Sequence, residues 1–146
     1  MPLINSQLLP TPDQVGLLIS DQLCDASVYV GALVYIEGGT AFNGLADDMS
    51  TSKVIGIVED KSSTTTCDIR IGGLSDEIFT GLDDNNNYFL SPSVAGGITL
   101  TAPNTSNHVV VKIGNPITDK IMLIGIEVRA KRSWLKLRIF GSLPIL

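Results

Sequence analysis

The chain has 146 residues, of which 44% are hydrophobic and 17% are charged, and its formal net charge is −5. This length is typical of one domain, and it allows a hydrophobic core that needs no disulfide or metal to support it. The low fraction of charged residues argues against intrinsic disorder and indicates that a partner covers some apolar surface.

The first 14 residues are predicted to form an extended N-terminal arm. Pro2, Pro10 and Pro12 interrupt this stretch, and proline neither continues a helix nor donates to a strand ladder. Such an arm is either a loose terminus or a clip over a neighbouring subunit. No basic residue precedes an apolar run, which argues against a signal peptide. No stretch approaches the ~20 apolar residues of a membrane-spanning helix, so we expect no membrane partner.

Residues 15–128 are predicted to form a β-domain of short strands. Residues 28–37 are rich in β-branched and aromatic side chains, and Gly38-Gly39 then supplies a tight turn. Further strands are expected at residues 40–46, 53–59 and 66–71.

Turn residues divide these strands. Gly56, inside an expected strand, predicts a bulge or a close approach of two backbones. Residues 60–65 are expected to turn the chain, and Gly72-Gly73 to end a strand. Turn signals recur about every 8–12 residues, and no window has the apolar spacing and caps of a helix. We therefore predict a single all-β domain, either a β-sandwich or a small β-barrel, with extended N- and C-terminal arms.

The two cysteines, Cys24 and Cys67, are interpreted as free, buried, apolar residues. A zinc site needs about four nitrogen or sulfur ligands, and the chain has a single histidine. A disulfide between the two cysteines remains an open alternative. The sequence predicts no cofactor and no metal centre.

One polar stretch could be compared with a calcium-binding loop. Asp83, Asn85 and Asn87 have the alternating spacing of the first ligands of an EF-hand. However, Tyr88 stands where that loop requires glycine, and Val94 stands where it requires glutamate. We therefore interpret the stretch as a polar hairpin loop, with weak Ca²⁺ binding at Asp83–Asn87 as the alternative.

Catalytic signals are absent from the sequence. His108 is the only histidine available as a base, and no G-x-S-x-G motif accompanies it. No glycine-rich phosphate-binding motif occurs either. The adjacent carboxylates Asp47-Asp48 and Asp76-Glu77 would point to opposite faces of a strand, which disfavours shared acid–base chemistry. We predict that the protein is not an enzyme.

The C-terminal segment, residues 129–146, differs in charge from the rest of the chain. It carries 5 basic and no acidic side chains, whereas residues 1–128 carry 15 acidic and 5 basic ones. This asymmetry predicts a segment that binds an acidic protein surface, or else a terminal strand that balances the acidic body. The expected partner-binding residues are Arg129, Lys131, Arg132, Trp134, Lys136, Arg138, Leu143 and Leu146.

The residue pattern of this segment is that of a strand. Leu135, Leu137 and Ile139 would share one face, and Lys136 and Arg138 the other. The apolar end, residues 143–146, would dock on a partner or against the protein's own core. Basic residues beside a tryptophan could also bind nucleic acid, but the acidic body would repel a polyanion and makes that partner unlikely.

Glycines and apolar pairs recur in a recognisable order between Val28 and Ile126. The motifs are Val30-Gly31-Ala-Leu-Val-Tyr-Ile, Gly38-Gly39, Val54-Ile-Gly56-Ile-Val, Tyr88-Phe-Leu-Ser91-Pro, Gly96-Gly97-Ile-Thr, Val111-Lys-Ile-Gly114 and Ile121-Met-Leu-Ile. In this order they resemble a β-module that recurs in structural proteins of tailed bacteriophage particles. The motifs are those of folding, so the resemblance implies no catalytic residue.

The resemblance implies a head decoration (cement) protein, a head fibre or a tail-associated protein. We expect a structural virion protein on the capsid exterior, made in the host cytoplasm, that binds across junctions of the major capsid protein. A homo-oligomer, either a dimer or a trimer, is expected as well. The alternatives are a tail, collar or fibre component, and a soluble carbohydrate- or ligand-binding β-domain. The latter would need exposed aromatic residues, yet aromatics make up only 5% of the chain.

Overall fold

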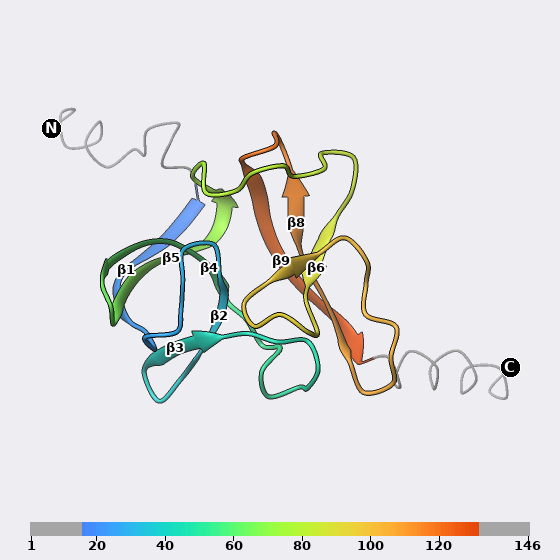
Figure 1. The fold of residues 1–146 in the computed structure, drawn as a ribbon, viewed down its shortest axis with the longest axis horizontal. Helices are drawn as coiled ribbons and strands as arrows, with labels where there is room; N and C mark the ends of the chain where they lie inside the picture. Colours follow the sequence, from blue (N-terminus) through green and yellow to red (C-terminus); the bar gives the residue numbers. More distant parts are fainter. Residues whose placement is uncertain (1–15, 132–146) are drawn as a thin grey trace, which may run out of the picture.

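The computed structural model describes residues 16–131, which form nine strands and no helix (Figure 1). The all-β prediction is therefore confirmed. The strands are β1 (Gly16–Leu23), β2 (Leu33–Glu37), β3 (Thr40–Asn43), β4 (Gly56–Ser63), β5 (Thr66–Leu74), β6 (Tyr88–Leu90), β7 (Ile98–Thr99), β8 (Val109–Pro116) and β9 (Met122–Lys131).

All nine strands belong to one antiparallel sheet with the order β3-β2-β4-β5-β9-β8-β6-β7, and β1 pairs with β5 outside this path. Strand β5 is thus hydrogen-bonded to β1, β4 and β9. In Figure 1, β1 to β5 lie on the left of the view, and β6, β8 and β9 on the right. The sheet is not closed into a barrel, so that half of the prediction is excluded and a sandwich-like arrangement remains.

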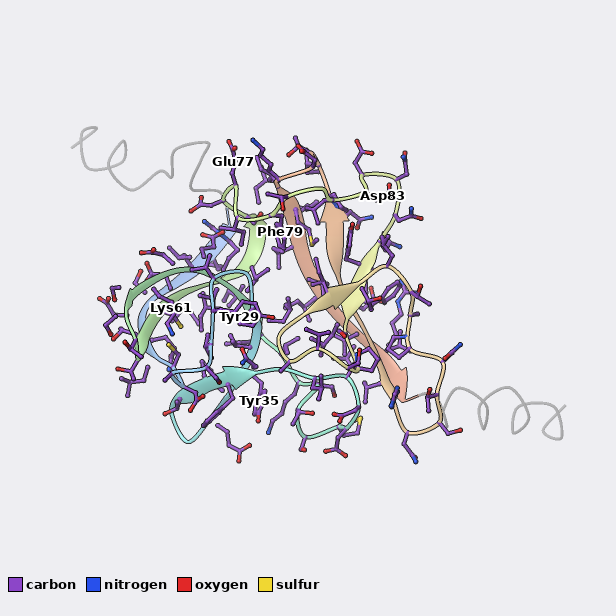
Figure 2. All side chains as sticks on the ribbon, in the orientation of Figure 1. Tyr29, Tyr35, Lys61, Glu77, Phe79 and Asp83 are labelled. Atoms are coloured by element: carbon purple, nitrogen blue, oxygen red, sulfur yellow. The ribbon has the colours of Figure 1, made fainter. Side chains whose placement is uncertain are left out.

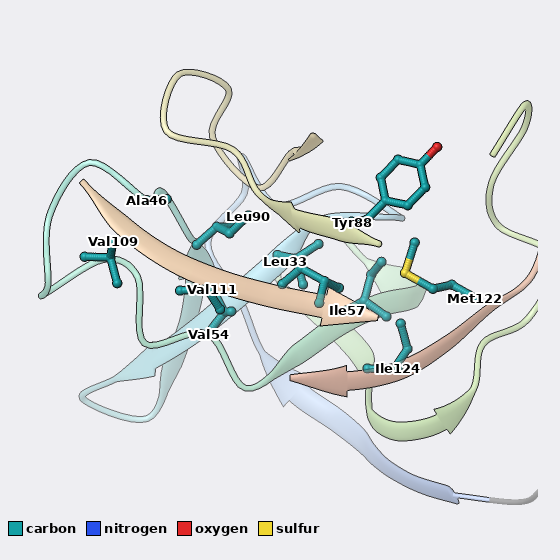
Figure 3. Close-up of a cluster of buried hydrophobic side chains, with 11 residues drawn as sticks. Leu33, Ala46, Val54, Ile57, Tyr88, Leu90, Val109, Val111, Met122 and Ile124 are labelled. Atoms are coloured by element: carbon teal, nitrogen blue, oxygen red, sulfur yellow. The ribbon is translucent and has the colours of Figure 1, made fainter. Parts of the chain in front are cut away.

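The sheet encloses two hydrophobic clusters. The larger one, called cluster A, gathers side chains from β2, β4, β6, β8 and β9 (Figure 3). Its buried members are Leu33, Ala46, Val54, Ile57, Tyr88, Leu90, Val109, Val111, Ile113, Met122 and Ile124. The smaller one, called cluster B, contains Cys24, Val28, Ala32, Val34, Ala41, Val58, Cys67 and Ile69.

Strands β2 and β4 supply side chains to both clusters. Leu33 of β2 and Ile57 of β4 belong to cluster A, whereas their neighbours Val34 and Val58 belong to cluster B. Successive residues of a strand point to opposite faces, so both faces of these two strands are buried. This explains why the sequences of both strands begin with apolar runs rather than with an alternating pattern.

Two glycines allow neighbouring strands to approach closely. A Cβ atom at Gly56 would lie 2.4 Å from the carbonyl oxygen of Arg70, and one at Gly114 would lie 2.1 Å from that of Leu123. No side chain fits at such distances, because the obstructing atoms belong to the backbone. The close approach predicted at Gly56 is confirmed, and β8 has a second one at Gly114.

Several expected boundaries differ from the structure. The strand expected at residues 40–46 ends at Asn43, and the strand expected from residue 53 begins at Gly56. Residues 28–32 precede β2 as a turn, in which Gly31 has a φ of 93°. Strand β4 continues to Ser63, so the turn before β5 is limited to residues 64 and 65. Gly73 does not end β5, because it pairs with both Gly16 and Ile124. At Ser63 and Gly73 a ladder continues where the sequence indicated a break, whereas residues 28–32 form a turn where the sequence indicated a strand.

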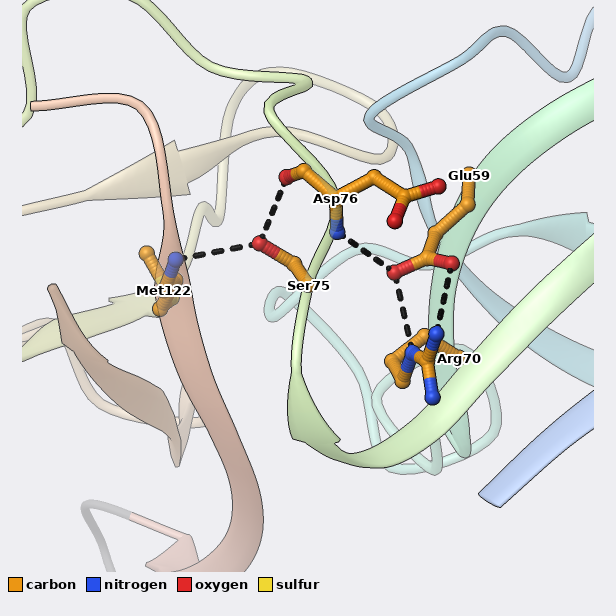
Figure 4. Close-up of polar contacts among 5 residues, drawn as sticks. All are labelled: Glu59, Arg70, Ser75, Asp76 and Met122. Carbon is orange, nitrogen blue, oxygen red and sulfur yellow. Dashed lines mark hydrogen bonds and ion pairs between the residues drawn. The ribbon is translucent and has the colours of Figure 1, made fainter. Parts of the chain in front are cut away.

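A buried polar network connects β4, β5 and β9 (Figure 4). Arg70 Nε donates to Glu59 Oε2 at 2.9 Å, and Arg70 Nη2 donates to Glu59 Oε1 at 3.1 Å. The backbone N–H of Asp76 donates to the same carboxylate at 2.9 Å. Ser75 Oγ donates to the carbonyl oxygen of Asp76 at 2.9 Å and accepts the backbone N–H of Met122 at 3.0 Å. The carboxylate of Glu59 therefore accepts three hydrogen bonds, which compensate for the burial of its charge.

Candidate interaction surface

The basic C-terminal segment begins inside the sheet rather than after it. Strand β9 continues to Lys131, which pairs with Val109 of β8. Strand β9 therefore includes residues 129–131, the first three of the predicted C-terminal segment. Arg129 Nε lies 3.3 Å from Glu127 Oε1, and both side chains are exposed, so this ion pair adds little stability.

Most of the predicted partner-binding residues lie outside the described part of the chain. Of the set, only Arg129 and Lys131 belong to residues 16–131. The others are Arg132, Trp134, Lys136, Arg138, Leu143 and Leu146, and the N-terminal arm at residues 1–14 is outside as well. Their role as a binding segment stays a prediction.

The outer face of β1 exposes three leucines that sequence reasoning missed. Leu17, Leu18 and Leu23 are 65%, 44% and 58% exposed. They pair with Gly72, Arg70 and Thr66 of β5, and the register shifts between Leu17 and Leu18, where Ile71 has no partner on β1.

Three carboxylates lie on the adjacent strands β1, β5 and β4, and the one on β1 stands between Leu18 and Leu23. Asp60 of β4 pairs with Asp68 of β5, and Asp68 Oδ1 accepts the backbone N–H of Asp21 of β1 at 3.0 Å. We call Asp21, Asp60 and Asp68 the acidic row. No cation within residues 16–131 lies within ion-pair distance of it. Like charges on paired residues repel each other, so this row would favour a basic partner.

The loop tested as a calcium site is organised by its own hydrogen bonds. Asp83 lies on the loop between β5 and β6, at the edge of the molecule (Figure 2). Its Oδ1 accepts the backbone N–H of Asn85 at 3.0 Å, and its Oδ2 accepts the side-chain amide of Asn86 at 2.7 Å. These hydrogen bonds hold the pKa of Asp83 below its ordinary value. Within residues 16–131 no group of three or more potential ligands could hold a metal ion.

The single histidine lines a shallow pocket of about 230 Å³. The pocket is bordered by Ser91, Pro92, Ser93, Thr99, Thr101, Ala102, Pro103, Asn104, Thr105 and His108. Ser91 Oγ accepts the backbone N–H groups of Ser93 and Val94 at 3.1 Å and 3.0 Å, so it braces a turn. These residues include no carboxylate that could orient His108 and no aromatic ring for a sugar to stack on. The pocket therefore adds no argument for catalysis or for carbohydrate binding.

Both cysteines are free and buried, as predicted. Cys24 and Cys67 both belong to cluster B. Burial and the neighbouring Cys24 raise the pKa of the Cys67 thiol. A neutral thiol is a poor nucleophile, so this pair behaves as part of the core.

Comparisons with protein-family models, with curated proteins and with solved structures give no match to this chain. No helix within residues 16–131 is long and apolar enough to cross a membrane.

Proposed function

We propose that the protein is a structural component of a bacteriophage particle, which decorates the capsid and cements it across junctions of the major capsid protein. The order of motifs between residues 28 and 126 carries this proposal. In the structure these motifs serve the fold: Gly114 lets β8 approach β9, and Ser91 braces the turn after β6. A module whose recurring residues are structural fits a protein that binds through its surface.

Exposed apolar side chains support a role in assembly. Twelve large hydrophobic residues are exposed among residues 16–131, and five of them exceed 50%: Leu17, Leu23, Val94, Ile117 and Val128. A cementing subunit would bury such side chains against neighbouring capsid proteins, with roughly 800 Å² covered on its own side of a stable interface. Many copies, each adding contacts over a junction, would resist the expansion of a pressurised shell.

The test is quantitative mass spectrometry of purified particles, with this chain scored against the major capsid protein. A ratio of about one to one, or a simple fraction of it, is expected for a decoration protein. A few copies per particle would instead favour a tail, collar or fibre component. Absence from particles would refute the virion proposal and favour a soluble binding domain.

A second test examines the basic segment. Because Lys131 is paired with Val109, the deletion must remove residues 132–146 and keep β9 whole. We expect the shortened protein to keep its fold and to bind empty shells more weakly than the full chain. Full-strength binding to shells would show that residues 132–146 are not the attachment segment. A chain ending at residue 128 is the wrong variant for this purpose, because it would lose part of the β8–β9 ladder.

A further inference from the structure

The edge of β1 that faces away from β5 is unpaired over most of its length. Among residues 16–131, β1 pairs only with β5, and past its end a single bridge joins Cys24 to Ala41 of β3. Gln22 Nε2 also donates to the carbonyl oxygen of Gly39 at 2.7 Å, so β1 approaches the β2–β3 hairpin only where it ends. An unpaired edge offers its N–H and C=O groups to a further strand.

The outer face of β1 has a distinct order of side chains. Exposed leucines stand at both ends, Leu17 and Leu18 at the start and Leu23 at the finish. Asp21 stands between them in the chain and is exposed, and its backbone N–H donates to Asp68 of β5. The order along the strand is therefore apolar, acidic, apolar.

The basic segment of the chain has the complementary order. Trp134, Lys136, Arg138 and Phe140 are alternate residues, which a strand would place on one face. Their order is aromatic, basic, basic, aromatic. Trp134 and Phe140 are 6 residues apart, as are Leu17 and Leu23, so the two patterns have the same length in extended chains.

We propose that residues 134–140 of a second copy of this chain add as a strand to the free edge of β1. Lys136 and Arg138 then lie beside Asp21, the member of the acidic row on β1, and the two aromatic side chains cover the leucines at either end. The intervening residues, Leu135, Leu137 and Ile139, lie on the opposite face, beside the half-buried Ile19 that packs on cluster B. Main-chain hydrogen bonds supply affinity in this mode of recognition, and the side-chain pattern sets the register.

The position of β9 favours a second copy over the chain's own segment. Strand β9 ends on the right of the view in Figure 1, and β1 lies on the left. A segment that follows β9 reaches the β1 edge of a neighbour more directly than it returns across its own sheet. Each copy offers one basic segment and one free edge, so the exchange can close as a dimer or as a ring such as a trimer. This self-association does not depend on binding to a shell.

Charge reversal in the full-length protein tests the proposal. We expect Lys136→Glu/Arg138→Glu to weaken self-association at least about tenfold, measured by sedimentation or light scattering over a range of concentrations. The matched control is Lys53→Glu/Lys120→Glu, which makes the same change in charge at two exposed positions away from β1 and should leave association unchanged. Equal weakening by both double variants would overturn the specific contact.

A reciprocal variant identifies the partner surface. Asp21→Lys alone should weaken association, and combining it with the reversed segment in one chain should restore association. Amide hydrogen exchange in residues 16–21 should slow as the protein concentration rises. A wild-type chain that stays monomeric at about 100 µM would overturn the proposal. Protection of β1 that is independent of concentration would assign the edge to the chain's own segment instead. Neither result would bear on whether the protein is present in particles.

Discussion

Arg70 donates two hydrogen bonds to the carboxylate of Glu59, and both side chains are at least 92% buried. Breaking such a pair is costly, because the remaining charge stays buried without its partner. We expect Arg70→Met to lower the free energy of unfolding by about 3–5 kcal/mol, measured by urea denaturation.

The double variant Glu59→Gln/Arg70→Met serves as the control. The carbonyl oxygen of the glutamine side chain can still accept the backbone N–H of Asp76. The double variant should therefore lose clearly less stability than Arg70→Met. Equal losses in the two proteins would mean that the charge pair matters less than the volume of its side chains.

The crossing of β8 and β9 gives a second prediction. At Gly114 an added Cβ would meet the carbonyl oxygen of Leu123, whereas at Gly125 it would meet no atom within 4 Å. Gly114→Ala should therefore cost about 2 kcal/mol or more, and Gly125→Ala should change stability by only about 0.5 kcal/mol. Thermal unfolding of the two variants separates them, and similar melting temperatures would argue against the close approach.

Thiol chemistry tests the packing of cluster B. Burial raises the pKa of Cys67 above the ordinary value of 9.0, so the folded protein keeps this thiol neutral where the unfolded chain ionises. The contribution of the neutral Cys67 thiol to the free energy of unfolding is fully present below pH 9. It is lost as the pH rises through the higher pKa of the folded protein. We expect a fall in stability above pH 9 that Cys67→Ala reduces, measured by denaturant unfolding at several pH values.

Reagent access offers a simpler check on the same residues. Neither Cys24 nor Cys67 should react with a thiol reagent at pH 8 in the folded protein, and both should react in urea. Rapid labelling under native conditions would contradict the buried position of the pair.

The loop at Asp83 gives a prediction of opposite sign. Hydrogen bonds from Asn85 and Asn86 lower the pKa of this carboxyl, so its contribution to loop order is present above the ordinary aspartate pKa and disappears as the pH falls through the lower folded value. A carboxyl titration by NMR should place the midpoint of Asp83 below 3.8, the ordinary value. In Asn86→Ala, one of these donors is removed and the midpoint should rise.

The strand content could be read from the sequence because it depends on local pattern. Gly38-Gly39 and the β-branched residues around them specify a hairpin, and Gly56 signalled a close approach without revealing its partner. The ends of β5 could not be placed in this way. Gly73 pairs with residues more than 45 positions away in both directions, and no local signal records such contacts.

The candidate surface was harder to foresee than the fold. Leu17 and Leu18 lie in an apolar stretch, and only the pairing of β1 with β5 at the edge of the sheet leaves both exposed. Glu59 and Arg70 look like surface charges until the paired strands bring them together inside the protein. In both cases the deciding contact joins residues that are distant in sequence.

The three partners of β5 have a consequence for how the protein comes apart. Strand β5 is paired with β1, β4 and β9. Its separation would therefore disturb two features at once, cluster B and the buried polar network that connects β4, β5 and β9. The two clusters are therefore expected to unfold in one cooperative step, without a stable half-folded intermediate. The many contacts between distant residues also predict slow folding, which would limit the rate at which subunits become competent to assemble.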